Sequence, residues 1–108
     1  MSGKGAYLRF FMLENHRHHG ILLYEWLLEQ AKAMGIRGGS AFRAIAGFGR
    51  HGVIHEQHFF ELAGDLAVRV DFVVSDADAD RLLELVDNEN LSILYARLAA
   101  EFGMTGEK

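Results

Sequence analysis

The sequence contains no cysteine, so the protein has neither a disulfide framework nor a thiolate nucleophile. A chain without cysteine suits a reducing compartment, and we expect a cytoplasmic protein. The first residues, 1–6, begin no continuous apolar run long enough for a signal peptide or a membrane span. We therefore expect no direct insertion into a membrane.

A net positive charge is also missing. The chain carries 11 Lys and Arg against 15 Asp and Glu, a net charge of −4, whereas proteins that bind nucleic acids usually present a basic surface to the phosphates. We expect no nucleic-acid partner. The charge is uneven, because residues 1–55 have a balance of +4 and residues 56–108 a balance of −8. The basic half contains a glycine-rich segment at residues 47–52.

The pattern of apolar residues predicts one small mixed domain. With 108 residues, half of them hydrophobic, the chain fits a single domain that spans residues 1–108. Alternating apolar residues predict strands, and apolar residues three and four apart predict helices. In chain order we predict a strand at 7–13, a helix at 21–34 that ends at Gly35, strands at 40–46 and 66–73, a helix capped by Ser75, a turn at 87–90 and a strand at 91–99.

This order of elements, β-α-β-β-α-β, predicts the α+β ferredoxin-like sandwich, in which two helices cover one face of a four-stranded antiparallel sheet. If the first two strands are parallel, the third must run antiparallel between them. Three connecting segments then share one end of the sheet: 14–20, 47–58 and 87–90.

The second face of this sheet has no helix to cover it. Its predicted side chains are a mixture of apolar and charged groups: Tyr7, Phe11, Val73, Arg9, Arg69 and Asp71. An uncovered face of this kind indicates burial against other copies of the chain, so we expect a homo-oligomer.

Several short motifs occur together at spacings typical of one family: Leu23-Tyr24-Glu25, Ala31-Lys-Ala-Met-Gly-Ile36, Gly38-Gly-Ser-Ala-Phe-Arg43, Ile45, Gly47-Phe48-Gly49, Ile54-His55 and Asp65-Leu66. In this combination the chain resembles the uncharacterised PII-like family of small bacterial proteins, related in fold to the nitrogen-regulatory PII signal proteins. The resemblance implies a homotrimer that binds a small effector, such as an adenine nucleotide, in a cleft between subunits. It also implies that the 47–58 loop touches a partner protein, of which a membrane transporter or an enzyme is the expected kind.

The 47–58 loop and the strand before it offer groups that bind anions. The glycines of the loop expose backbone N–H groups and allow positive φ, and the neighbouring arginines supply charged donors for a phosphate. The residues that we expect to bind a small anionic effector are Arg43, Gly47, Phe48, Gly49, Arg50 and His55. Alternatively, the glycines only permit a turn, and Arg43 pairs with an acid on a neighbouring strand. The sequence identifies no cofactor.

All six histidines fall in two of the three segments that meet at one end of the sheet: His16, His18 and His19 in the first, and His51, His55 and His58 in the second. Clustered imidazoles bind zinc, copper or nickel, so a metal-binding sensor that uses His51, His55 and His58 is the alternative function. The histidines need not converge, however. No serine or cysteine nucleophile and no paired carboxylates stand in a recognisable setting, so we do not expect an enzyme.

Overall fold

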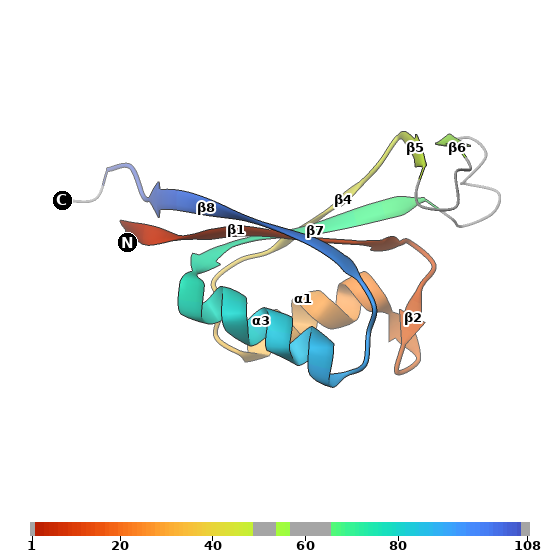
Figure 1. The fold of residues 1–108 in the computed structure, drawn as a ribbon, viewed down its shortest axis with the longest axis horizontal. Coiled ribbons are helices and arrows are strands. Elements are labelled where there is room, and N and C mark those ends of the chain that lie inside the picture. Colours follow the sequence, from red (N-terminus) through yellow and green to blue (C-terminus); the bar gives the residue numbers. More distant parts are fainter. Residues whose placement is uncertain (1, 49–53, 57–65, 107–108) are drawn as a thin grey trace.

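The computed structural model of the chain describes residues 2–48, 54–56 and 66–106. Four of its strands form one sheet: β1 (Ser2–Leu13), β4 (Ser40–Arg43), β7 (Ala67–Ser75) and β8 (Leu94–Gly103). Two helices, α1 (Leu23–Ala33) and α3 (Asp76–Asn88), both lie on the same face of that sheet (Figure 1). The predicted α+β ferredoxin-like sandwich is confirmed.

Strand β7 lies between β1 and β4, and the order of the sheet is β4-β7-β1-β8. It runs antiparallel to both neighbours, with Leu8 of β1 opposite Phe72 and Ala41 of β4 opposite Val70. Strands β1 and β4 are therefore parallel to each other, as predicted. Strand β8 pairs antiparallel with the other side of β1 and forms the second edge.

The core lies between the sheet and the two helices because alternate residues of the strands point toward the helices. Phe10 of β1 and Phe72 of β7 meet edge to face, with ring centroids 6.2 Å apart. Leu27 of α1 and Leu82 of α3 pack against this layer and are completely buried. The helices thus bury their apolar stripes on the sheet, and the side chains on its other face remain outside the core.

Both helices end in the Schellman motif, in which a left-handed residue follows the last helical turn. In α1 that residue is Gly35, with φ of 87°, as predicted. In α3 it is Asn90, with φ of 57°, and the N–H group of Leu91 donates to the carbonyl of Val86. The predicted cap at the start of α3 is also confirmed, because Ser75 Oγ accepts a hydrogen bond from the backbone N–H group of Asp78. Neither helix in the described part of the chain is long and apolar enough to cross a membrane.

The last strand begins later than predicted, at Leu94 rather than at residue 91. Leu91 and Ile93 alternate like strand residues in the sequence. In the structure, however, Leu91 completes the cap of α3, and both side chains pack against the core. The predicted turn at 87–90 likewise begins two residues late, because α3 continues through Asn88.

Two of the connecting segments, the one after β1 and the one after β4, contain short strands that the sequence analysis missed. Segment 14–20 holds β2 (Arg17–His18), which pairs with β3 (Ile21–Leu22) in a hairpin, so α1 starts two residues later than predicted. The predicted strand at 40–46 is divided between two strands in the structure, β4 and β5. The last hydrogen bond from this segment to β7 comes from the N–H group of Ala44, which donates to the carbonyl of Ala67, the first residue of β7. The chain then continues as β5 (Ala46–Phe48), which pairs with β6 (Ile54–Glu56).

Close backbone contact between β1 and β7 predicts a glycine requirement at Gly5. A Cβ atom there would lie 2.1 Å from the carbonyl oxygen of Val74 and 2.9 Å from the Cα atom of Ser75. We expect Gly5→Ala to lower the free energy of unfolding by about 1–3 kcal/mol, because the backbone must move to admit a methyl group. Gly3→Ala is the matched control, since its nearest atom would be Phe102 Cζ at 3.9 Å. Equal stability of the two variants in urea unfolding would contradict the prediction.

Candidate functional site

The described parts of the three connecting segments lie at one end of the sheet, as predicted. Figure 1 shows the β5–β6 ribbon above the sheet at that end and the β2–β3 hairpin below it, on the side of the helices. Two side-chain contacts join segments that are distant in the sequence: Arg43 with Glu14, and His18 and His19 with Glu89. The chain therefore gathers basic, acidic and imidazole groups in this region.

Arg43 pairs with Glu14, the first residue after β1. The backbone of Glu14 is itself fixed, because its N–H group donates to the carbonyl of Leu66 at 2.6 Å. Arg43 thus pairs with an acid, as in the alternative that the sequence left open, but this acid directly follows β1 and does not lie on a strand next to β4. An anion that approaches the guanidinium group of Arg43 must therefore compete with the Glu14 carboxylate.

The β5–β6 ribbon brings together two of the predicted ligand-binding positions through their backbones. Gly47 lies opposite His55, and Phe48 lies opposite Ile54. The Phe48 side chain is exposed. The other predicted anion-binding residues, Gly49 and Arg50, and two residues of the predicted metal set, His51 and His58, lie outside the described residues.

His18, His19 and Glu89 form a compact group, here called the His18–His19–Glu89 cluster. His18 Nε2 lies 2.8 Å and His19 Nε2 2.7 Å from the same oxygen, Oε1 of Glu89. These hydrogen bonds, first from His18 and then from His19, lower the pKa of the Glu89 carboxyl group. The sequence analysis placed segments 14–20 and 87–90 at the same end of the sheet but did not identify Glu89, because a shared neighbourhood does not decide which side chains meet.

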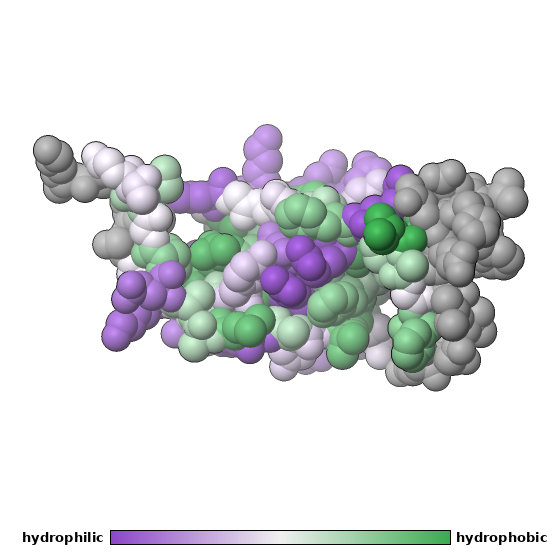
Figure 2. Space-filling view, turned by 90° about the horizontal axis from the view of Figure 1, so that it is seen from above, coloured by the Kyte–Doolittle hydropathy of each residue, from purple (hydrophilic) through white to green (hydrophobic). Residues whose placement is uncertain are grey.

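The open face of the sheet contains a buried carboxylate. Asp71 on β7 is only 6% exposed and accepts hydrogen bonds from Tyr7 Oη at 2.7 Å and from Arg69 Nε at 2.8 Å. Arg9 Nε lies 3.9 Å from it, and the Arg9 guanidinium group stacks on the Tyr7 ring. Figure 2 shows this face, with hydrophilic groups near its middle and hydrophobic groups around them. The predicted mixture of charged and apolar side chains is present on this face, and Asp71 is the carboxylate to which Tyr7 and Arg69 donate their hydrogen bonds.

A groove of about 310 Å³ lies on the open face along the edge strand β4. Its lining combines the backbone of Gly38 and Gly39 with Ser40, the rings of Tyr7 and Phe42, and the side chains of Asp71 and Val73. Backbone groups that no side chain covers can approach a ligand closely, and aromatic rings offer a flat apolar surface. The groove therefore has the features of a site for a flat polar molecule.

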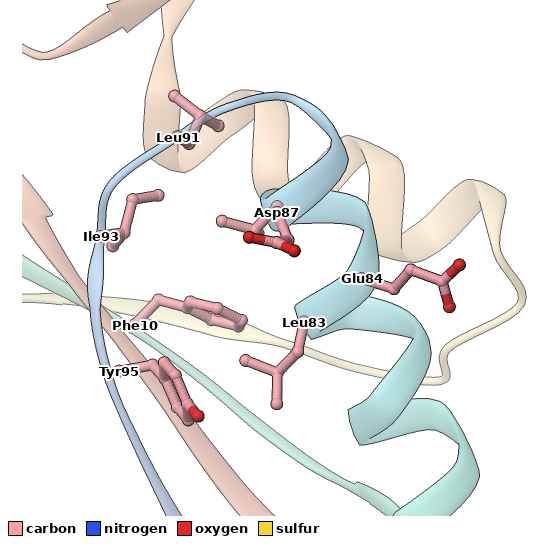
Figure 3. Close-up of a pocket in the computed structure, with 8 residues that line it drawn as sticks. Phe10, Leu83, Glu84, Asp87, Leu91, Ile93 and Tyr95 are labelled. Carbon is pink, nitrogen blue, oxygen red and sulfur yellow. The ribbon is translucent and has the colours of Figure 1, made fainter.

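A second hollow, of about 380 Å³, lies between α3 and β8 (Figure 3). Most of its lining is apolar, with Phe10 and Leu83 on opposite sides. Its charged lining residues, Glu84 and Asp87, are both acidic. No basic residue is among the lining residues of this hollow, whereas the one carboxylate that lines the groove, Asp71, is paired with Tyr7 and Arg69. The hollow therefore suits a phosphate less well than the groove does.

The four-stranded sheet, with two helices on one face and a ribbon that leaves β4, is the fold of PII-like proteins. The chain is similar to CPII, a nitrogen regulatory PII-like protein from Thiomonas intermedia K12, in a structure bound to ADP, AMP and bicarbonate. The TM-score is 0.69, with 18% sequence identity, and the match covers 96% of this chain and 92% of that chain.

The sequence comparison defines the family. Residues 5–94 match the model of the DUF190 family, described as "Uncharacterized ACR, COG1993", and the chain belongs to this family. A UPF0166 protein of Aquifex aeolicus (strain VF5) is 33% identical over 100 residues, which cover 85% of this chain and 95% of the relative. A UPF0166 protein of Methanocaldococcus jannaschii is 28% identical over 95 residues, which cover 84% of this chain and 87% of the relative. The predicted resemblance to an uncharacterised PII-like family is confirmed.

The Asp71 carboxylate predicts a stabilising role for the Tyr7 hydroxyl. We expect Tyr7→Phe to lower the free energy of unfolding by about 1.5–3 kcal/mol, because a buried charge loses one hydrogen bond. Tyr24→Phe is the control: Tyr24 is also partly buried, and its hydroxyl makes no hydrogen bond within the described part of the chain. Thermal or urea unfolding measures both variants, and equal losses would show that the Asp71 contact contributes nothing.

Proposed function

We propose that this protein is a PII-like regulatory protein that binds a small anionic effector, an adenine nucleotide with or without bicarbonate, in a cleft between subunits. The observation that carries the proposal is the likeness in fold, over 96% of this chain, to CPII bound to ADP, AMP and bicarbonate. The effector changes the conformation of the 47–58 loop, which then contacts a partner protein, a membrane transporter or an enzyme. Such a switch requires only that the effector bind one loop conformation better than the other.

The subunits assemble as a trimer through the open face of the sheet. Five of the large hydrophobic side chains that the single chain leaves exposed belong to strand positions on this face: Leu13, Phe42, Val73, Leu94 and Leu98. Burying this much apolar surface against other copies stabilises an assembly. Asp71 accepts hydrogen bonds from Tyr7 and Arg69 of its own chain, which lowers the cost of burying its charge. The Arg9 Nε atom beside it is buried without a hydrogen-bond partner in the described part of the chain.

Assembly also completes the effector site. The groove beside Gly38 and Gly39 is open on the exposed face, and a second copy that covers this face encloses it. Arg43 follows the groove residue Phe42 on the same edge strand. It lies opposite the core residue Val68, so its side chain starts on the helix side of the sheet, where it pairs with Glu14. From Arg43 the chain continues to Gly47 and the β5–β6 ribbon. The effector phosphates bind Arg43, Gly47, Phe48, Gly49, Arg50 and His55, the residues that the sequence identifies at the base of the loop.

The ion pair between Arg43 and Glu14 provides the means of switching. A phosphate that takes the place of the Glu14 carboxylate draws Arg43 toward the effector, at the point where the chain enters β5. Because Glu14 directly follows β1 and is fixed to Leu66 through its backbone, the released carboxylate stays in place while the arginine moves. Effector binding is thus coupled to the position of the ribbon.

Titration calorimetry with ADP, AMP and bicarbonate tests the effector site. We expect the wild-type protein to bind an adenine nucleotide, and Arg43→Ala combined with Arg50→Ala to weaken its affinity at least about tenfold, since each arginine supplies charge-assisted hydrogen bonds. Arg81→Ala is the matched control, because Arg81 has the same side-chain exposure as Arg43 and also pairs with a carboxylate. No binding by the wild type, or equal losses in both variants, would refute the proposed site.

Mass measurement in solution by light scattering tests the assembly. We expect three times the mass of the chain for the wild type and a smaller particle for Leu98→Lys, because a charge then lies on the buried open face. Tyr95→Lys is the matched control: it changes an equally exposed residue of the same strand that faces the helices. A monomeric wild type, or a trimer that survives Leu98→Lys, would place the interface elsewhere or remove it.

A further inference from the structure

The His18–His19–Glu89 cluster presents two imidazole nitrogens and one carboxylate oxygen within 4.8 Å of one another. We propose that this cluster binds a divalent first-row transition-metal ion, of which Zn²⁺ is the probe. The site is distinct from the effector groove, which lies on the opposite face of the sheet. It also differs from the set of His51, His55 and His58, since two of its three ligands come from the β2–β3 hairpin and one from the end of α3.

The ligand atoms need only a small movement to coordinate a metal. At Zn–N and Zn–O distances of about 2.0–2.2 Å, tetrahedral ligands lie about 3.3 Å apart, whereas His18 Nε2 and His19 Nε2 now lie 2.8 and 2.7 Å from Glu89 Oε1. The two nitrogen–oxygen distances need to open by about half an ångström, which is within reach of side-chain rotation, and the two imidazole nitrogens lie within 4.8 Å of each other. Two imidazoles and a carboxylate leave a fourth position for water, and imidazole nitrogen favours zinc, copper and nickel over Mg²⁺ and Ca²⁺.

The turn of the hairpin brings the two imidazole rings together. Consecutive side chains on a strand point to opposite sides, so neighbouring histidines do not normally converge. Here His19 and Gly20, with φ of 52° and 83°, form the two-residue turn between β2 and β3, and two positive φ values in such a turn are typical of type I′. The ring centroids of His18 and His19 are consequently 4.1 Å apart.

Trp26 of α1 packs beside both imidazole rings. Its ring meets that of His18 edge to face at 4.6 Å and lies 6.3 Å from that of His19. Trp26 is itself buried against the core, so it forms a fixed base for the imidazoles. Ligands that are already held in place lose less conformational entropy when a metal binds.

The end of α3 supplies both the carboxylate and a favourable field. Glu89 is the C-cap residue of α3, and the left-handed Asn90 that follows it closes the Schellman motif, which fixes the backbone. The C-terminal end of a helix carries a partial negative charge that attracts cations. The exposed fractions of the three side chains, 15% for His18, 65% for His19 and 31% for Glu89, show that an ion can enter from the side of His19.

Metal binding at this cluster links the β2–β3 hairpin to the end of α3, two segments about 70 residues apart in the sequence. An ion that binds only the folded protein stabilises it by mass action. We therefore expect Zn²⁺ to raise the melting temperature of chelator-treated protein, by an amount that grows with the logarithm of the ratio of Zn²⁺ concentration to Kd. Mg²⁺ added at the same concentration leaves the melting temperature unchanged.

Titration calorimetry of the chelator-treated full chain with Zn²⁺ tests the site. We expect one Zn²⁺ per chain, and Glu89→Gln and His19→Ala each to weaken the affinity at least about tenfold. His16→Ala is the matched control, since His16 is an exposed histidine of the same segment outside the cluster. Co²⁺ provides a second readout: the intense visible absorption of a tetrahedral site appears in the wild type and in His16→Ala and is lost in Glu89→Gln.

Three results would overturn the inference: no Zn²⁺ binding by the wild type, unchanged affinity in both Glu89→Gln and His19→Ala, or loss of binding in a variant without His51, His55 and His58 while the cluster is intact. Melting curves of the metal-free variants establish that each one folds. Titration with ADP in parallel keeps this test separate from that of the effector site, because neither result depends on the other.

Discussion

The antiparallel pairing of β1 with β7 is the interaction on which the rest of the structure depends. It extends from Gly5 opposite Ser75 to Leu13 opposite Ala67, and the other two strands of the sheet attach to its outer sides. The period of two along each strand divides the side chains into a helix-facing set and an outward set. A slip of one residue would exchange the two sets, so this register fixes both the core and the open face.

The same pairing decides which loops are neighbours. Because β1 and β4 are parallel on either side of β7, the chain leaves both at one end of the sheet, where α3 also ends. Glu14 there meets Arg43, and the hairpin histidines meet Glu89. Backbone hydrogen bonds hold the acid of each pair: Glu14 through its link to Leu66, and Glu89 through the cap of α3. The charged groups of the candidate sites therefore rest on rigid elements even though they lie in loops.

The open face joins two properties that seldom occur together in one sheet. It exposes large apolar side chains, and it buries the Asp71 carboxylate under Tyr7 and Arg69. A buried charge is tolerated where hydrogen bonds and opposite charges replace water. Because Tyr7 and Arg69 belong to the same chain as Asp71, each subunit satisfies this carboxylate by itself. Two arginines, Arg9 and Arg69, face the one carboxylate, so these three groups together keep a net positive charge on the open face.

The sequence by itself determined the order of the main strands and of the two helices, their inward faces, the end of α1 at Gly35 and the start of α3 at Ser75, since periodicity and capping are local properties. It placed the basic, glycine-rich and histidine-rich segments at one end of the sheet. Only the tertiary structure decided that Leu91 caps a helix instead of starting a strand, that Arg43 pairs with Glu14, and that Glu89 joins two histidines. The cap by Leu91 is local, but apolar alternation at residues 91 and 93 fits a strand equally well, and packing against the core decides between the two. The other two contacts join side chains far apart in the chain, and a local pattern does not determine which of them meet.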